Sequence, residues 1–459
     1  MSTKKMLSLL LVVMLVGLAI LWFYITRQVP LTYEQLSPEP APVSPKSTAS
    51  EVTVGYGSST KDAEYEAVNE AVAQALKPFN GEAPEYAILF STVGYDVAKV
   101  VQETRKLLPA TKFLGGTSMF GVFTTAGYHV GGRGSLAILA VSSPRITFGV
   151  GGADITKFSG AEEAGREAIN LALASAGKTG EKPTMVYIMG SFGNEEALLS
   201  GIEQVVGTEV PIVGGSAFDD DASGKWSEFV GDQVYTTGVA LTVFFTDLKV
   251  AWAYESGYDK TTNRGVITKA SGRTIEEIDN QPALDVYNEW TGGLVTEMLP
   301  NAKDGVIVNI QDSALNPIAK ILRGTRGEVH YLSMHPYYWD LTKKSINLGA
   351  NVATGEEVTL MHGTWETNLN HARVTPSKAL ASKNIQPGTA YFGIFSYCVG
   401  KLLTLPEGER DKIPLLVNQS LGDISFIGAN TGGEQGYLEG VGNRHGDLIA
   451  GVIIFGPEY

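Results

Sequence analysis

Five polar residues near the end of the chain are of types that could do chemistry: Cys398, Lys401, Asn430, Glu434 and His445. A thiol can serve as a nucleophile with His445 as its base, and Asp447 could orient that imidazole. Such a site would make the protein a small-molecule hydrolase or transferase. A lone cysteine after an apolar strand is more often a small buried hydrophobe, and no local signature of a cysteine enzyme surrounds Cys398. We therefore expect these residues to bind a ligand and expect no catalytic residue.

Three serines stand where an apolar strand passes into a helix: Ser91, Ser191 and Ser396. Serine is a favoured helix N-cap, and capping alone could explain each of them. Alternatively, hydroxyl groups and free helix N–H groups could gather at the strand ends and hold a carboxylate or phosphate. We include the three serines in the candidate ligand site.

Two glycine pairs follow apolar runs, in the stretches "FLGGTSMFG" and "PIVGGSAF". Adjacent glycines indicate a bulge, a tight bend or a close approach to the backbone by chain or ligand. No Gly-Lys-Ser/Thr follows, so neither stretch is a nucleotide-binding loop. We favour the ligand interpretation, which adds six candidate residues: Gly115, Gly116, Thr117, Gly214, Gly215 and Ser216.

Composition excludes several other partners. The formal net charge is −14, whereas nucleic-acid binding requires a basic face, so we expect no nucleic-acid partner. The 6 histidines show no zinc-type spacing with the single cysteine, and no H-E-x-x-H motif occurs. We expect no metal site and no cofactor.

The elements that must position these residues form a repeated pattern. A strand at 86–91, a helix at 96–108, a Gly-Gly segment and a strand at 134–143 recur as 185–191, 194–206, "PIVGGSAF" and a final apolar strand. Ser91 lies 24 residues before Gly115, and Ser191 lies 23 before Gly214. A looser third copy spans 390–456. The pattern predicts an α/β fold of repeated strand-helix-strand-strand units, which form mixed sheets in two associated domains.

The segment before the third copy has a less regular pattern. Strands are expected at 305–310 and 329–334, with a helix from about Ala314 to Arg323 between them.

The N-terminus predicts a membrane anchor. Residues 6–25 form a stretch of 20 residues without a charge, the length at which a helix crosses a bilayer. Two lysines precede it, which favours a cytoplasmic N-terminus and an extracytoplasmic globular part. We therefore expect one transmembrane helix within 1–27, an uncleaved signal anchor, followed by a Pro/Ser-rich stalk at 28–50. A cleaved signal peptide is the alternative.

At these motifs the chain resembles the FIST sensory family. "FLGGTSMFG" and its echo "PIVGGSAF" are similar to the N-terminal FIST domain. "FSYCVGK" is similar to the Phe-x-Cys-x-Gly-Arg segment of the C-terminal domain, and "IGANTGGEQGYLEGVGNRHGD" to its closing Gly-Glu-Ile-Gly stretch and histidine. By this match Gly433 joins the candidate site. Lys401, Gln435 and Gly446 depart from the arginine, isoleucine and asparagine of the family pattern.

The resemblance implies domains at 51–256 and 257–459. It further implies a sensory module that binds a small ligand, such as an amino acid or a related carboxylate, and signals through a partner protein.

Overall fold

The structure, a computed structural model, describes residues 52–458. The predicted anchor at 6–25 and the stalk at 28–50 lie outside these residues. Within the described range, no helix combines the length and the apolar character needed to cross a membrane. The prediction of a mixed α/β fold is confirmed, because the helices lie between strands of several mixed sheets.

Three repeated units build the body of the molecule, so the third copy expected from the sequence is present. The first unit comprises β1 (Thr53–Ser59), α2 (Glu64–Ala75), β2 (Tyr86–Ser91), α3 (Val97–Leu107), β3 (Lys112–Thr117), β4 (Val122–Thr124), β5 (Gly127–His129) and β6 (Leu136–Ser142). The second comprises β7 (Ile146–Asp154), α4 (Ala161–Ser175), β8 (Met185–Ser191), α5 (Glu195–Val206), β9 (Ile212–Ala217), β10 (Glu228–Val230), β11 (Gln233–Tyr235) and β12 (Gly238–Thr246). The third comprises β13 (Leu248–Glu255), α9 (Trp365–Ser382), β23 (Phe392–Cys398), α10 (Val399–Thr404), α11 (Lys412–Leu421), β24 (Ser425–Thr431), β25 (Glu434–Leu438), β26 (Gly442–Gly446) and β27 (Ala450–Glu458).

Each unit forms a six-stranded sheet that it cannot complete alone. Four strands are its own, in the orders β1-β6-β2-β3, β7-β12-β8-β9 and β13-β27-β23-β24. The last two come from another unit, because each unit lends its hairpin to the sheet of the preceding unit. The hairpin β10–β11 pairs with β3, β25–β26 pairs with β9, and β4–β5 closes the circle on β24.

A ring of three backbone hydrogen bonds joins the units where the Gly-Gly strands end. The Phe218 N–H donates to the Thr117 carbonyl over 3.1 Å, and the Gly432 N–H to the Ser216 carbonyl over 2.9 Å. The Met119 N–H completes the ring on the Asn430 carbonyl over 3.3 Å. The three acceptor residues, Thr117, Ser216 and Asn430, are equivalent, because each lies two residues after an equivalent glycine. The units are therefore related by a pseudo-threefold arrangement.

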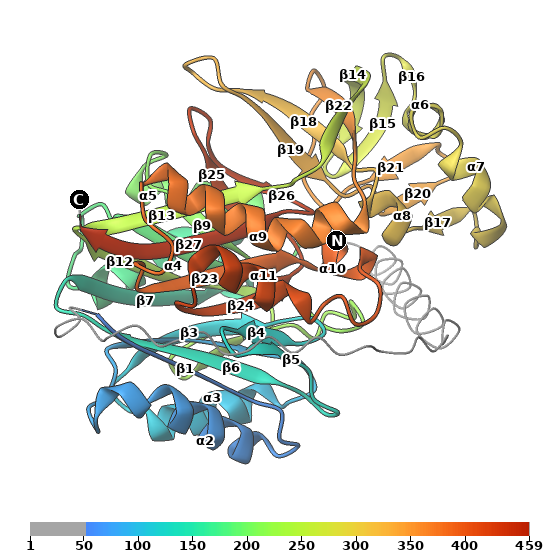
Figure 1. The fold of residues 1–459 in the computed structure, drawn as a ribbon. Coiled ribbons are helices and arrows are strands. Elements are labelled where there is room, and N and C mark those ends of the chain that lie inside the picture. The colour runs from blue at the N-terminus through green and yellow to red at the C-terminus, as the bar shows by residue number, and fades with distance from the viewer. Residues whose placement is uncertain (1–51, 459) are drawn as a thin grey trace.

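One hydrophobic core is shared by the three sheets. Each sheet turns one face inward, and its parallel strands read as nearly continuous apolar runs because both faces are covered. Aromatic contacts link the sheets: the rings of Tyr86 and Phe148 stack at 4.8 Å between centroids, and Phe244 packs at a tilt against Phe455 at 5.0 Å. The helices α2 and α3, α4 and α5, and α9 and α11 cover the outer faces (Figure 1).

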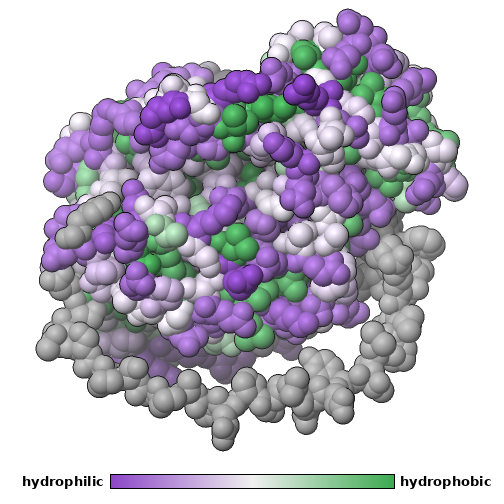
Figure 2. Space-filling model, turned by 45° about the horizontal axis from the view of Figure 1, so that its top comes forward, coloured by the Kyte–Doolittle hydropathy of each residue, from purple (hydrophilic) through white to green (hydrophobic). Residues whose placement is uncertain are grey.

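A β-rich insertion interrupts the third unit between β13 and α9, and it projects from the body (Figures 1 and 2). Its nine strands form one sheet. The elements are β14 (Asp259–Ser271), β15 (Thr274–Ile278), β16 (Gln281–Pro282), α6 (Ala283–Trp290), α7 (Leu294–Met298), β17 (Val306–Val308), α8 (Gln311–Ala314), β18 (Ile318–Arg323), β19 (Val329–Met334), β20 (Tyr338–Asp340), β21 (Ser345–Asn347) and β22 (Glu357–His362).

The helix expected at 314–323 is wrong. The chain forms only the short α8 and then the strand β18, which pairs with β19 and β22. Pro317 separates the two elements. Proline cannot continue a helix because it lacks the N–H and restricts the preceding residue, so the apolar residues beyond it belong to a strand.

The three serines predicted to be equivalent are not. Ser91 pairs with Thr117, Ser191 with Ala217 and Ser396 with Ala429, so each lies at a different offset from the Gly-Gly segment. A one-residue shift along a strand turns a side chain to the other face. Other residues also occupy the N-cap positions of the helices: Asp96 for α3, Asn194 for α5 and Cys398 for α10, of which Asp96 accepts a hydrogen bond from the helix.

The glycines of the two pairs lie against protein atoms. A Cβ on Gly115 or Gly214 would meet a backbone carbonyl oxygen, of Leu89 at 1.7 Å or of Ile188 at 1.9 Å. A Cβ on Gly116 or Gly215 would meet side chains of the neighbouring unit. The close approach that these glycines permit is an approach of chain to chain.

We expect Gly214→Ala to destabilise the protein by about 1–3 kcal/mol, because the added methyl group cannot displace a strand carbonyl without moving the sheet. The matched control is Gly132→Ala, at an exposed glycine with no neighbouring atom within 4 Å of the added methyl group. Urea unfolding of both variants measures the difference. Equal stability of the two would contradict the packing described here.

Candidate functional site

The structure identifies the true equivalents of the strand-end position as Thr92, Ser191 and Cys398. Each lies three residues after the strand residue that pairs with the equivalent glycine, in the pairs Leu89–Gly115, Ile188–Gly214 and Phe395–Gly428. A glycine follows each of them two residues later. Each also accepts a backbone N–H from the segment that enters the next strand: Ser135 at 2.9 Å, Gly238 at 2.6 Å and Leu448 at 3.2 Å, respectively. The position therefore has a structural role that a hydroxyl or a thiol can fill.

A second set of equivalent positions lies on the lent hairpins. Glu228 pairs with Gly116, Glu434 with Gly215, and Val122 with Ala429. The three units thus have different residue pairs at equivalent positions: Thr92 with Val122 in the first unit, Ser191 with Glu228 in the second, and Cys398 with Glu434 in the third. Ser191 Oγ donates to Glu228 Oε2 over 3.0 Å, and the Cys398 thiol hydrogen-bonds to Glu434.

Cys398 is poorly suited to be a nucleophile. Its side chain is buried, and burial raises the pKa of the thiol well above its ordinary value, an effect that Glu434 and Asp447 increase. Catalytic cysteines instead lie in electropositive, partly exposed surroundings that lower the thiol pKa. Burial likewise raises the pKa of Glu434, only partly opposed by hydrogen bonds from Thr431 and Ile449.

His445 belongs to a separate buried cluster between the body and the insertion. Arg273, at the β14–β15 turn, donates to Glu195 over 2.7 Å and to Glu196 over 2.8 Å. His445 Nε2 lies 3.9 Å from Glu195 and 3.3 Å from the Gly349 carbonyl. Although burial opposes it, the pKa of Glu195 is lowered by His445 and Arg273.

Three members of this cluster offer ligand atoms to a metal ion. Glu195, Glu196 and His445 place one oxygen or nitrogen each within 4.8 Å of one another, a set that the spacing of histidines in the sequence does not predict. The guanidinium group of Arg273 already bonds to both carboxylates. Positive charge is therefore supplied at this place by the chain itself.

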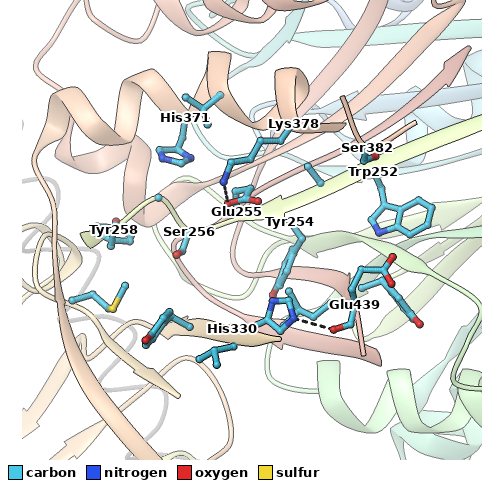
Figure 3. Close-up of a pocket in the computed structure, with 18 of the residues that line it drawn as sticks. Trp252, Tyr254, Glu255, Ser256, Tyr258, His330, His371, Lys378, Ser382 and Glu439 are labelled. Carbon is cyan, nitrogen blue, oxygen red and sulfur yellow. Dashed lines mark hydrogen bonds and ion pairs between the residues drawn. The ribbon is translucent and has the colours of Figure 1, made fainter. Parts of the chain in front are cut away.

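An open pocket with a volume of about 620 Å³ lies where the insertion meets the third unit (Figure 3). Volumes of this size are typical of sites for small ligands. The walls come from the end of β13, the outer face of α9, strand β19 and the tip of the β25–β26 hairpin. They are lined by Trp252, Tyr254, Glu255, Ser256, Gly257, Tyr258, His330, Tyr331, Met361, His371, Lys378 and Tyr437, among others.

Opposite charges face each other across the pocket. Lys378 reaches from α9 and donates to Glu255 on β13 over 2.7 Å (Figure 3).

His371 lies on the same face of α9, seven residues before Lys378. Its Nδ1 is buried and has no hydrogen-bond partner among the residues that the structure describes. Burial lowers the pKa of His371 to about 3, and Lys401 and Lys378 contribute, so this imidazole is neutral.

The candidate residues from the sequence fall into three groups. Ser91, Ser396, Asn430 and the glycine pairs are packed inside the body; Asn430 Nδ2, for example, holds the lent hairpin through Met119 and Tyr128. Ser216 and His445 lie beside Glu195, to which Ser216 Oγ donates over 2.8 Å, and Ser191 bonds to the nearby Glu228. Cys398, Lys401 and Glu434 lie behind the pocket wall, and the Tyr254 hydroxyl donates to the Glu434 carbonyl. Gly433 lies beside the His445 ring and has no side chain with which to bind a ligand.

The pocket residues themselves were missed. Those on α9 follow a helical spacing, with His371, Lys378 and Ser382 seven and four residues apart on one face, which was visible in the sequence. Nothing local in the sequence, however, relates that helix to the end of β13. In the chain, α9 and the end of β13 are separated by the insertion of about a hundred residues, and the fold of that insertion brings them together.

Two family models match consecutive parts of the chain. The family model of the FIST N domain matches residues 85–281, and that of the FIST C domain matches residues 283–437.

Individual relatives are distant or partial. An uncharacterized protein of Methanocaldococcus jannaschii is 33% identical over 90 residues, which are 19% of this chain and 18% of that protein. The chain therefore matches less than a fifth of the length of this relative. Among solved structures, a cyanuric acid hydrolase from A. caulinodans has a TM-score of 0.37 at 8% identity, covering 89% of this chain and 100% of the other. PurLQS from Thermotoga maritima has a TM-score of 0.22 at 10% identity, covering 88% and 72%.

We expect the two buried glutamates to make the protein less stable as the pH rises. Folding raises the pKa of Glu228 and Glu434 above the ordinary 4.5, so above that pH the folded protein binds more protons than the unfolded one. The free energy of unfolding then falls with pH from the ordinary pKa up to the raised one. In Glu434→Gln the decline should be smaller, as measured by urea unfolding from about pH 4.5 to about pH 8.

The control for this prediction is Glu103→Gln, where the sign is opposite. Hydrogen bonds from Lys106 and Asn69 lower the pKa of Glu103, so its contribution to stability is present above the ordinary pKa and lost as the pH falls. If Glu434→Gln and Glu103→Gln change the pH slope in the same direction, the raised pKa of Glu434 is refuted.

Proposed function

Since the chain belongs to the FIST family, we propose that it is a membrane-anchored sensory module that binds a small ligand and signals through a partner protein. FIST domains are sensory, ligand-binding domains. The observation that carries the proposal for this chain is the pocket between β13, α9 and β19, where a lysine and a glutamate face each other.

The ligand class follows from these charges. A zwitterion such as an amino acid carries a carboxylate for Lys378 and an ammonium group for Glu255. Both side chains are partly exposed, by 55% and 31%, so their mutual ion pair contributes little stability. A ligand can replace that pair with two charge-assisted hydrogen bonds at small cost. The rings of Trp252, Tyr254 and Tyr437 offer apolar surface to the rest of the ligand.

Binding without catalysis is supported by the state of the nearest reactive groups. The thiol of Cys398 is protonated and buried, and its hydrogen-bond partners are Glu434 and the Leu448 N–H. His445 contacts Glu195, Gln435 and backbone carbonyls. Both groups contact Glu434, Cys398 through its carboxyl group and His445 through its carbonyl oxygen, and among the described residues the thiol is not hydrogen-bonded to the imidazole. A base that does not bond to the thiol argues against a Cys398–His445 hydrolase or transferase.

The anchor remains part of the proposal on the strength of the sequence. Residues 6–25 are long and apolar enough to cross a bilayer, and the lysines before them favour a cytoplasmic N-terminus. The ligand pocket would then face the extracytoplasmic side.

A ligand screen tests the pocket. We expect amino acids or related organic acids to stabilise the detergent-purified full chain against heating, by about 2.7 kcal/mol at a hundred times the Kd. For the ligand so found, Lys378→Met and Glu255→Gln should each weaken binding about 10- to 150-fold, the loss of one charged hydrogen bond.

The matched control is Lys412→Met. It breaks an ion pair of the same length, 2.7 Å, and similar exposure, with Glu409, and neither of these two residues lines the pocket. Unchanged affinity in Lys378→Met, or an equal loss in Lys412→Met, would refute the assignment of the ligand to this pocket.

The anchor has its own test. We expect the native protein to remain with membranes after a carbonate wash and to keep its original N-terminus, because a spanning helix is not released by charge neutralisation. Protease added outside intact cells should digest the chain beyond Gln28. A soluble form that begins within 28–50 would refute the anchor, and a protected globular part would refute the orientation.

A further inference from the structure

Lys401 does not line the pocket, yet its polar contacts go to the pocket walls. The side chain is fully buried on α10, three residues after Cys398. Its Nζ donates to the Ser256 carbonyl and, over 3.1 Å, to Asn368 Oδ1. It also lies 4.7 Å from the centroid of the Tyr258 ring. Ser256 and Tyr258 belong to one wall of the pocket, and Asn368 belongs to the helix that forms the other.

The two walls are held together at three points. Asn368, His371 and Lys378 lie three and seven residues apart, on one face of α9. Lys378 bonds to Glu255 at the outer end of the pocket. In the middle, His371 packs so closely on Gly257 that a Cβ there would lie 1.9 Å from Nε2. Lys401 supplies the inner connection, through Asn368 and Ser256.

The inner connection differs from the outer one in its environment. The Lys378–Glu255 pair is partly exposed, so water competes with it. Lys401 is enclosed, and an unmade hydrogen bond there would leave a buried polar group without compensation. The groups that face Lys401 are Cys398 on its own side, Glu434 from the hairpin, Glu255 from β13, and Tyr258 and His371 from the pocket walls.

We propose that Lys401 is a positioning residue for the ligand pocket: its buried ammonium group holds the 256–258 segment against α9 and so sets the separation of the two walls. The functional meaning of this role rests on the proposed function of the pocket. This role explains why Lys401, in the motif "FSYCVGK", has a buried ionisable group although it does not line the pocket.

The test measures hydrogen exchange of the full chain without any ligand, so its outcome is independent of which ligand binds. In Lys401→Gln the amides of 254–258 and of the first turns of α9 should exchange about 10- to 100-fold faster than in the wild type, because a charged buried hydrogen bond is lost. Lys401→Arg keeps the charge and the donors and should retain the protection.

A pH profile separates positioning from simple space filling. Burial lowers the pKa of Lys401 to about 7, so protection of 254–258, corrected for intrinsic exchange, should fall as the pH rises through that value in the wild type. It should stay constant in Lys401→Arg, because arginine remains charged. Should Lys401→Arg fail to fold, Asn368→Asp serves instead, since the added carboxylate should move the midpoint of the profile to higher pH.

Two results would overturn the proposal. One is equal protection of 254–258 in folded Lys401→Gln and the wild type. The other is a wild-type profile that does not respond to pH, or that responds identically in Lys401→Gln.

Discussion

The closed exchange of hairpins is the constraint on which the molecule depends. Each sheet needs two strands from the next unit, and the ring formed by the carbonyls of Thr117, Ser216 and Asn430 fixes the three units at their centre. Because a sheet edge left open would expose unpaired backbone groups, no unit is complete without its neighbours. The glycine pairs exist for this reason: the strands that carry them must pass within contact of another chain segment on both faces.

The approximate threefold arrangement also explains why the polar groups differ so strongly between units. The same place holds Thr92 with Val122, then Ser191 with Glu228, then Cys398 with Glu434. The third pair lies behind the pocket, because the insertion in the third unit forms the opposite wall of that pocket. The same insertion also reaches the second unit through Arg273, which bonds to Glu195 and Glu196 at the start of α5.

Sequence patterns predict regular elements well here and side-chain neighbourhoods poorly. The repeated strands and helices were found because apolar runs and helical spacing are local properties. The equivalence of the serines was wrong by one or two residues, although intervals of 24 and 23 already hinted at a shift; aligning Thr92-Val93-Gly94 with Ser191-Phe192-Gly193 gives equal intervals. The pocket could not be predicted, because the residues on β13 and on α9 are separated by the whole insertion. The predicted helix before Arg323 failed at Pro317, a breaker that outweighed the apolar spacing.

The cyclic hairpin exchange has a consequence for the origin of the chain. An arrangement in which every unit gives one hairpin to its neighbour, and the last closes on the first, is the geometry of a ring-shaped homotrimer built by strand swapping. Joining three such subunits into one polypeptide keeps the ring while releasing each copy from the demand for identity. A single copy can then acquire an asymmetric addition, as the third has between Glu255 and Trp365, without the threefold penalty that every change carries in a symmetric assembly.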